Sequence, residues 1–308
     1  MKILLTGGGG MVGRNVLAHP HSKNFIIFSP SSIELNLLDI NAIDIFLSRY
    51  QPDVIIHSAG VVGGIQANIK NPTKFFSDNI LMGINLINSA KKNNIKKLLN
   101  LGSSCMYPRN CSDAITEDMV LKGELEPTNE GYALAKIASA RLCHYIRKEE
   151  PDFLYKTIIP CNLYGKYDKF DAENSHMIPG VIRKISYAVE KNIPVIDIWG
   201  SGEARREFMY AEDLADFIFY SLNEFEKIPD VLNVGMGKDY SINEYYKIIA
   251  NIIGFKGTFA HDLSKPTGMM RKLIDATLLS DFGWKYKTEL EVGIRKTYQY
   301  FLTEINND

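Results

Sequence analysis

A tyrosine and a lysine four residues apart are the first candidates for chemistry in this chain. Tyr132 and Lys136 fall in a helical pattern over residues 132–149, and residues four apart lie one turn apart on the same helix face. The spacing Y-x-x-x-K also occurs on ordinary solvated helices. The pair therefore needs support from residues elsewhere in the chain.

Ser103 and Ser104 supply that support, because they follow an apolar run at Leu98–Leu101 that is typical of a buried strand. A hydride delivered to a ketone carbon leaves negative charge on the oxygen, which must then receive a proton. Tyrosine, with a pKa of about 10, is a poor donor near neutrality unless its phenolate is stabilised. We expect Lys136 to lower the pKa of Tyr132 and to hold a cofactor ribose. Ser103 is expected to orient the ketone, with Ser104 as its alternative, and the pattern indicates a carbonyl reductase.

A glycine cluster at the start of the chain predicts the cofactor. An apolar strand-like run, Ile3–Leu5, leads into glycines that fit G-x-G-x-x-G from Gly8 or G-x-x-G-x-x-G from Gly7, and an apolar helical stretch follows. Glycines let a backbone approach a phosphate closely, and the helix N-terminus attracts the anion. The context of strand, turn and helix predicts a dinucleotide site. The residues expected to bind the cofactor in this turn are Gly7, Gly10, Met11, Val12 and Gly13.

The end of the second predicted strand bears on the choice between NAD and NADP. An acidic residue there favours the free 2′-hydroxyl of NAD, but the sequence has Ser29–Ser32, which contains no carboxylate. Serine hydroxyls can donate to a 2′-phosphate, and Arg14 is close in sequence to the glycine turn. The segment favours NADP, while the lack of a cation within it leaves NAD open.

Composition excludes several classes of protein. The chain has 308 residues, 45% hydrophobic residues and a net charge of −1, so no basic excess indicates a nucleic-acid partner. No apolar run reaches the roughly 18 residues of a membrane span. The first strand begins at the initiator, and the four cysteines have no paired spacing typical of a metal site. We expect a cytoplasmic protein with reduced thiols, no metal and no membrane or nucleic-acid partner.

Strand-like runs alternate with helical patterns through the first half of the chain, which predicts βαβ units and a doubly wound, Rossmann-type parallel sheet. The expected strands are Ile3–Leu5, Phe25–Phe28, Val54–His57, Leu98–Leu101 and Thr157–Ile159, and the expected helices are 41–50, 72–93, 132–149 and 178–191. Val195–Ile198 is predicted as a further strand of the same sheet.

Beyond residue 165 the regular alternation weakens, which predicts a smaller α/β domain built from discontinuous pieces. We assign residues 1–165 and 192–232 to the dinucleotide-binding domain, and residues 166–191 and 233–308 to a substrate domain. The two domains should close a cleft over the carboxyl ends of the strands, where such sheets bind ligands.

Together with the glycine turn, Ser103 and the Tyr132/Lys136 pair, several longer motifs extend over nearly the whole chain. They are Val62–Ile65, Leu101–Pro108, Glu126–Glu130, Asn174–His176 and Trp199–Gly202. In these motifs the chain resembles the GDP-L-fucose synthases of the extended short-chain dehydrogenase/reductase superfamily. The resemblance implies an NADP(H)-dependent enzyme that inverts C3 and C5 of a GDP-4-keto-6-deoxy sugar and reduces the C4 ketone. It also suggests a homodimer formed through helices 72–93 and 132–149.

The resemblance assigns a base and an acid to the epimerisation. Protons on the carbons beside a ketone are acidic, and inversion needs a base on one face and an acid on the other. Cys105 and His176 match the family's base and acid. A thiolate is a reactive base, and histidine can give a proton near neutral pH. Cys111, Cys143 and Cys161 are interpreted as small hydrophobic residues.

The resemblance also implies residues that bind the nucleotides. Arg206 and Lys272 are candidates for the diphosphate or ribose of the GDP-sugar, because cations recognise phosphate. Trp199 is a candidate for stacking on guanine, with core packing as the alternative. Asn162 matches a segment beside the nicotinamide and the sugar. Two further positions carried over are Asp39, as an adenine contact, and Lys184, as a substrate contact.

Two alternatives remain at this stage. One keeps the fold and the C4 reduction but takes a GDP-4-keto-6-deoxy-heptose, with little or no epimerisation. The other is a dinucleotide-binding sensor without catalysis, which would need none of Ser103, Tyr132, Lys136, Cys105 or His176.

Overall fold

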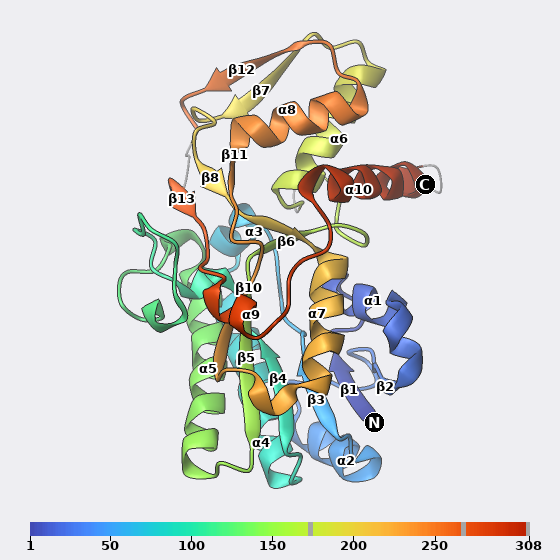
Figure 1. Cartoon of the computed structure of the whole chain (residues 1–308), viewed down its shortest axis with the longest axis vertical. Coiled ribbons are helices and arrows are strands. Elements are labelled where there is room, and N and C mark those ends of the chain that lie inside the picture. Colours follow the sequence, from blue (N-terminus) through green and yellow to red (C-terminus); the bar gives the residue numbers. More distant parts are fainter. Residues whose placement is uncertain (172–174, 266–268, 306–308) are drawn as a thin grey trace.

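The computed structural model describes residues 1–171, 175–265 and 269–305, and its largest element is a parallel sheet of six strands in the order β10-β5-β4-β3-β1-β2 (Figure 1). The strands are β1 (Lys2–Thr6), β2 (Ile26–Phe28), β3 (Val54–His57), β4 (Lys97–Leu101), β5 (Leu154–Pro160) and β10 (Val231–Val234). The inner strands are buried almost throughout, as expected for strands covered on both faces. The predicted doubly wound α/β class is confirmed.

Helices cover both faces of this sheet. Ile3 and Leu5 of β1 pack in one core cluster, whereas Leu4 between them packs in another. This alternation is the period-two pattern of a strand buried on both sides. The first cluster contains residues of α1 (Met11–Ala18) and α7 (Ala211–Asn223), and the second contains residues of α2 (Ile40–Tyr50) and α4 (Pro72–Lys92). The helix α5 (Glu130–Glu149) contributes to both clusters.

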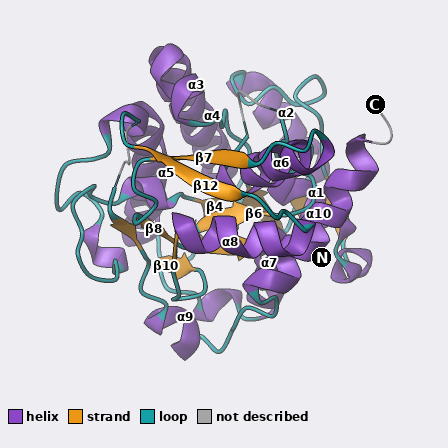
Figure 2. Ribbon diagram, turned by 90° about the horizontal axis from the view of Figure 1, so that it is seen from above, coloured by secondary structure: helices purple, strands orange, loops and turns teal. Residues whose placement is uncertain are grey.

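The upper part of the molecule in Figure 1 is built from short strands and three longer helices. Its helices are α6 (Met177–Glu190), α8 (Ile242–Ile253) and α10 (Leu290–Ile305). Within the described residues, the short strands form the sets β11 (Tyr240–Ser241) with β8 (Arg205–Arg206) and β13 (Arg271–Lys272), β12 (Thr258–Asp262) with β7 (Val195–Trp199), and β6 (Asn162–Tyr164) with β9 (Phe208–Tyr210). Seen from above, β7 and β12 run side by side next to α8 (Figure 2).

The prediction that Val195–Ile198 extends the main sheet is wrong. The strand forms as β7, but it pairs in parallel with β12, and β10 takes the edge of the main sheet beyond β5. Ile196 and Ile198 are buried while Val195 and Trp199 are exposed, so the strand covers a core on one face only. A strand of the main sheet would be buried on both faces. The two-domain division stays a prediction, and this pairing is a reason to place β7 with the smaller part.

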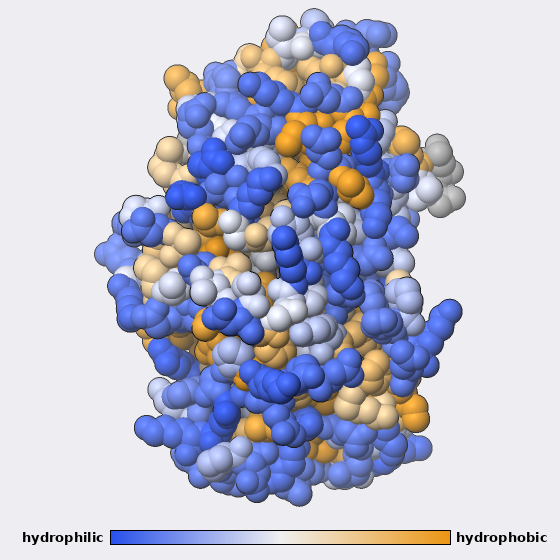
Figure 3. Space-filling model, viewed as in Figure 1, coloured by the Kyte–Doolittle hydropathy of each residue, from blue (hydrophilic) through white to orange (hydrophobic). Residues whose placement is uncertain are grey.

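Other short elements connect these layers. They are α3 (Ile65–Lys70), α9 (Thr277–Asp281) and the 3-10 turns η1 (Pro20–Asn24), η2 (Ser104–Met106), η3 (Glu117–Met119), η4 (Pro127–Asn129) and η5 (Phe225–Lys227). The surface in Figure 3 is mainly hydrophilic, with apolar residues in small groups. Within the residues described, no helix is long and apolar enough to cross a membrane. All four cysteines are described, and each is a free thiol.

Candidate active site

The glycine turn joins β1 to α1 and is closed by backbone contacts. Gly7 has a φ of +74°, and a Cβ there would lie 2.6 Å from the backbone nitrogen of Ala59. A Cβ on Gly13 would overlap the carbonyl oxygen of Gly7, whereas Gly10 donates its N–H to that oxygen at 3.0 Å. Gly7 and Gly13 are therefore required by close approach. Gly10 is the N-cap of α1, so Met11 and Val12 begin the helix at the turn.

Residues expected around the adenosine lie on the neighbouring elements. Ser29, just after β2, is in contact with Gly8, so the end of the second strand reaches the glycine turn. Asp39 caps α2, accepting from the N–H groups of Asn41 at 2.9 Å and Ala42 at 3.2 Å. The guanidinium of Arg14 lies 4.0 Å over the ring of Tyr167. The glycine turn, the N-terminus of α1 and these polar groups fit a dinucleotide at the carboxyl ends of β1 and β2.

Ser103 and Tyr132 are brought together where β4 ends beside α5. The Ser103 hydroxyl lies near enough to the Tyr132 hydroxyl to lower the pKa of the phenol. Ser103 Oγ also accepts from the N–H of Cys105 at 3.3 Å. Ser104 is only 4% exposed and begins η2. The structure therefore places Ser103, rather than Ser104, beside the tyrosine.

The expected effect of Lys136 on the pKa of Tyr132 stays a prediction. Its Nζ donates to the carbonyl of Leu101 at 2.9 Å and lies 5.9 Å from the centre of the Tyr132 ring. Burial raises the pKa of Tyr132, and the nearby Cys105 raises it further. Burial also lowers the pKa of Lys136 to about 8. The ammonium of Lys136 thus donates to a backbone carbonyl. Burial favours the protonated form of the Tyr132 phenol.

His57 lies next to this lysine and was not singled out from the sequence. It is 2% exposed, and its Nδ1 lies 2.8 Å from Thr6 Oγ1. Burial lowers the pKa of His57 to about 3, and the charge of Lys136 acts in the same direction. The imidazole is therefore neutral and serves to join β3 to β1.

Cys105 faces two donors from distant parts of the chain. The Nδ2 of Asn129 donates to its Sγ at 3.2 Å, and the Nζ of Lys272 lies 3.7 Å from the same sulfur. Cys105 is half-buried and free. Asn129 was not singled out from the sequence, although it belongs to the motif Glu126–Glu130.

His176 is paired with a carboxylate that sequence reasoning missed. Its Nδ1 lies 3.2 Å from Oδ1 of Asp168, and the hydrogen bond to Asp168 raises the pKa of His176. The side chain of Asp168 is 3% exposed, while that of His176 is 43% exposed. The backbone of the adjacent Ser175 comes near Gly64, so the motifs around positions 62–65 and 174–176 meet. Asn174 of the second motif lies outside the described residues.

The two candidate phosphate-binding cations are neighbours in a small sheet. Arg206 of β8 and Lys272 of β13 are register partners in a parallel pair, so their side chains lie on one face. Arg206 is half-buried, and burial lowers the pKa of its guanidinium. Arg205 and Arg271 alternate with them, and both pair with Asp239, at 2.9 and 2.6 Å.

Glu207 joins the elements that carry these cations and was also missed from the sequence. It is 1% exposed, and its carboxylate accepts from the N–H groups of Met236 at 2.6 Å, Gly237 at 2.8 Å and Ile274 at 3.0 Å. Burial raises the pKa of Glu207 to about 7. Its own carbonyl accepts from Asn162 Nδ2 at 2.9 Å, which ties β6 to the same network. A lone glutamate between Arg206 and an apolar strand was the available signal.

Trp199 and Lys184 lie in the upper part of the molecule. Trp199 is 53% exposed, with the Nζ of Lys265 5.6 Å from its ring, so core packing is not its role. Lys184 of α6 pairs with the carboxylate of Asp197 at 2.8 Å and donates to its carbonyl at 2.7 Å. The structure thus leaves Trp199 open to a ligand, whereas Lys184 holds α6 to β7.

Comparison with known proteins identifies the family. The model of the NAD dependent epimerase/dehydratase family matches residues 3–235. The chain belongs to this family. A GDP-L-colitose synthase of Yersinia pseudotuberculosis is 65% identical over 308 residues, covering 100% of both chains. A GDP-L-fucose synthase of Azorhizobium caulinodans is 47% identical and covers 98% of this chain and 96% of its own. The resemblance to GDP-L-fucose synthases is confirmed.

A solved structure supports the same grouping. MlghC, a GDP-mannoheptose C4 reductase from Campylobacter jejuni with NADP bound, is 29% identical with a TM-score of 0.89. The match covers 98% of this chain and 98% of that chain. Members of the NAD dependent epimerase/dehydratase family are enzymes, and this chain is one of them.

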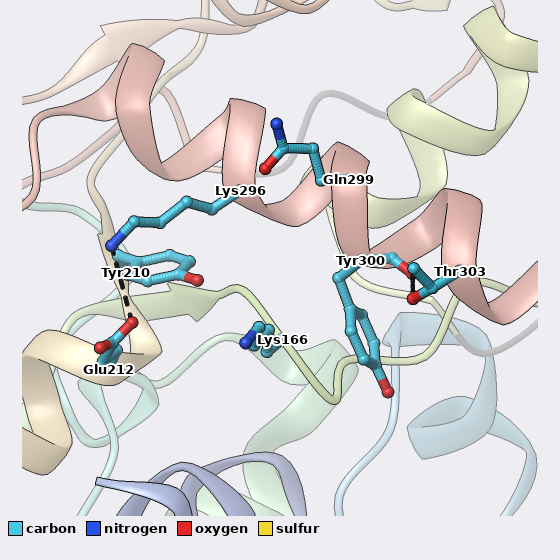
Figure 4. A pocket seen from close by; sticks show the side chains of 7 residues that line it. All are labelled: Lys166, Tyr210, Glu212, Lys296, Gln299, Tyr300 and Thr303. Carbon is cyan, nitrogen blue, oxygen red and sulfur yellow. Dashed lines mark hydrogen bonds and ion pairs between the residues drawn. The ribbon is translucent and has the colours of Figure 1, made fainter. Parts of the chain in front are cut away.

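One pocket is lined by residues that the sequence did not single out. It has a volume of about 520 Å³, and its lining includes none of the residues predicted for the site (Figure 4). The lining residues are Lys166, Tyr210, Glu212, Lys296, Gln299, Tyr300 and Thr303. Among the residues described, no group of three or more His, Cys, Asp or Glu side chains could hold a metal ion.

Proposed function

We propose that this enzyme inverts C5 and reduces the C4 ketone of a GDP-4-keto-deoxyhexose, and that its product is GDP-L-colitose. The observation that carries the proposal is the meeting of Ser103, Tyr132 and Cys105 in one site, where a proton donor for a ketone oxygen lies beside a thiol. Inversion and reduction share the C4 ketone, so both sets of groups must surround one sugar ring.

The inversion is assigned to Cys105 and His176. The Cys105 thiolate takes the C5 proton, and the electron pair of the C–H bond moves into an enolate at O4. His176, held by Asp168, returns a proton from the opposite face. C5 is then inverted, the thiol is protonated and the imidazole is neutral, and proton exchange with water restores both groups.

The reduction is assigned to Tyr132 and Ser103. NADP(H) is the cofactor, and when bound it supplies the hydride for C4. Ser103 donates to the ketone oxygen, and Tyr132 gives its proton to that oxygen as charge develops there. The raised pKa of Tyr132 keeps this proton on the phenol until the transfer. Lys136, Asn162 and the glycine turn position the cofactor and the sugar.

The choice of sugar follows the order of similarity. L-Colitose is the 3-deoxy form of L-fucose, so C3 carries no hydroxyl and only C5 needs inversion. The similarity of 65% to a GDP-L-colitose synthase exceeds the 47% to a GDP-L-fucose synthase. GDP-L-fucose, the product favoured by the sequence motifs, is the second candidate and uses the same groups at C3 and C5. The heptose alternative is supported by relatives of 28–29% identity.

The test is a comparison of three substrates with the purified enzyme. GDP-4-keto-6-deoxy-mannose, its 3-deoxy counterpart and its heptose analogue are each incubated with NADPH in deuterated water. We expect the 3-deoxy sugar to have a kcat/KM at least about tenfold above the others, a difference of roughly 1.4 kcal/mol in transition-state binding. NMR of the product should show deuterium at C5 and the L configuration. A product with the original C5 proton would overturn the epimerase assignment, and preference for the fucose precursor would select the second candidate.

We also propose that the enzyme forms a homodimer through α4 and α5. α4 and α5 lie side by side along one flank of the molecule (Figure 1). Several of their apolar side chains are exposed, namely Phe76, Leu81, Leu134 and Tyr145. These residues are available for a matching face on a second copy of the chain.

A further inference from the structure

Cys105 is the meeting point of two donors that reach it from separate elements. Asn129 lies at the N-terminus of α5 and Lys272 lies on β13, more than 140 residues later in the chain. Their polar atoms lie 3.2 and 3.7 Å from the sulfur. A donor amide and an ammonium group both favour negative charge on an atom that they face.

Asn129 is committed to this contact. Its side chain gives no cap to α5, and its Oδ1 is buried with no partner among the described residues. Sulfur is a weak acceptor when neutral and a stronger one when ionised. A half-buried amide whose donor is directed at a thiol is best satisfied when that thiol carries charge.

Lys272 also has no ion-pair partner among the described residues. Arg205 and Arg271, the alternating residues of β8 and β13, share the carboxylate of Asp239. On the other face, no carboxylate of the described residues lies within ion-pair distance of Arg206 or Lys272. The small sheet therefore has one neutralised face and one cationic face, and the cationic face contains Lys272 in contact with Cys105.

We propose that Asn129 and Lys272 hold Cys105 in its thiolate form, and that Lys272 thereby serves proton abstraction rather than the diphosphate. This rests on the proposed function, because the thiolate is the base that removes the C5 proton. The diphosphate is then held by Arg206, the register partner of Lys272.

The first measurement is the alkylation rate of Cys105 by iodoacetamide at neutral pH, without substrate, followed by peptide mass spectrometry. Only the thiolate reacts, so the rate reports the charge on sulfur. We expect Lys272→Met to slow the reaction about tenfold, because a cation about 4 Å away is lost. Lys272→Arg should restore most of the rate. Asn129→Asp, which replaces a donor by a negative charge of the same shape, should slow it at least as much.

Internal references separate this effect from general damage. Lys227→Met removes an exposed lysine paired with Glu224 and should leave the Cys105 rate unchanged. Cys111, which is half-buried, is measured in the same samples and should react equally in all variants. An unchanged Cys105 rate in Lys272→Met would overturn the proposal.

The second measurement is the affinity for GDP by calorimetry. The proposal expects less than about a twofold change in Kd for Lys272→Met, whereas a phosphate contact would cost about tenfold or more. A weakened GDP affinity with normal alkylation would return Lys272 to the diphosphate. Both readouts are made without turnover, so they stay interpretable even if the wild-type enzyme acts on none of the three keto sugars, the result that would reject the proposed function instead.

Discussion

The Nδ1 atom of His176 lies 3.2 Å from Oδ1 of Asp168, and this pair joins an exposed imidazole to a buried carboxylate. The hydrogen bond raises the pKa of His176 above its ordinary value of 6.5. The second carboxylate oxygen, Oδ2, is buried with no partner among the residues described. Oδ1 also accepts from the backbone N–H of Lys169 at 2.9 Å. The carboxylate keeps the histidine charged to a higher pH than a free histidine.

The first prediction is that Asp168→Asn moves the pH dependence of C5 inversion to lower pH. The protonated imidazole is the acid, so inversion is lost as the pH rises through the pKa of His176. Removing the carboxylate lowers that pKa, and the loss begins earlier. Deuterium incorporation at C5 measured from pH 5.5 to 9 reports the shift, and Asp152→Asn, in an exposed turn, is the control. An unchanged profile would remove Asp168 from the mechanism.

The same pair has a consequence for stability. A raised folded-state pKa means that the stabilisation is complete below about pH 6.5 and is lost as the pH rises through the folded-state value. Wild type and Asp168→Asn should therefore differ in Tm at pH 6 and converge at pH 9. A Tm difference that is small at pH 6 and grows towards pH 9 would contradict a raised pKa for His176.

The second prediction concerns Tyr132 and separates the two half-reactions. Tyr132→Phe removes the proton donor of the ketone and should lower the rate of NADPH oxidation by at least about 100-fold. Exchange of the C5 proton, which uses Cys105, should continue. The rate of NADPH oxidation is followed by its absorbance, and exchange of the C5 proton is followed by NMR. The control variant Tyr145→Phe, on the exposed side of α5, should behave as wild type. Substantial NADPH oxidation by Tyr132→Phe would reject the reductase role.

The sequence contained enough to predict the fold class and most of the site. Gly7 and Gly13 could be predicted because only glycine fits the close contacts of the turn. Tyr132 and Ser103 could be predicted from their spacing and their order along the chain. β7 was misplaced because an alternating strand can join any sheet that leaves one face open. Its own pattern, with Asp197 between two isoleucines, was the sign of a half-buried strand.

The supporting residues were beyond sequence reasoning for a physical reason. Asn129, Asp168 and Glu207 act through contacts made by tertiary packing, and nothing in their local sequence fixes those partners. The hydrogen bond from Lys136 to the carbonyl of Leu101 was missed for the same reason. Spacing along a helix places two side chains on one face, but it does not show that a carbonyl of Leu101 takes the ammonium.

The third prediction tests Glu207 as the residue that holds the nucleotide-binding strands. In Glu207→Gln the oxygen can still accept from Met236 and Gly237, but the amide nitrogen faces the N–H of Ile274. A donor that faces a buried donor costs about 1–3 kcal/mol. We expect a lower Tm and a several-fold higher KM for the GDP-sugar with a smaller change in kcat. Glu226→Gln, which alters a 78% exposed side chain, is the control.

The Tm difference between wild type and Glu207→Gln should also depend on pH. Burial raises the pKa of Glu207 from 4.5 to about 7. A raised folded-state pKa contributes stability that is present below pH 4.5 and is lost as the pH rises through 7. The Tm difference between wild type and Glu207→Gln should therefore narrow between pH 5 and 8. A difference that stays constant over this range would show that the carboxylate is ionised at every pH tested.

The fourth prediction is that Trp199 binds guanine rather than supporting the core. Its ring is 53% exposed at the end of β7, so Trp199→Ala should leave Tm within about 1 °C of wild type. Loss of a stacking platform costs roughly 1–3 kcal/mol per base, and the Kd for GDP should rise about fivefold or more. Trp199→Phe keeps a ring and should recover part of the affinity. An unaltered GDP affinity in Trp199→Ala would leave the tryptophan without a ligand role.

The fifth prediction concerns the flank formed by α4 and α5. Leu81 and Leu134 are 48% and 39% exposed, and burying the remaining half of each side chain is worth about 1 kcal/mol. If a second copy covers them, light scattering should give wild type twice the chain mass of 34.8 kDa. Leu81→Arg and Leu134→Arg place charges in that interface and should give monomers. Leu263→Arg changes a side chain that is 74% exposed on another surface and should remain dimeric, whereas a monomeric wild type would reject this interface.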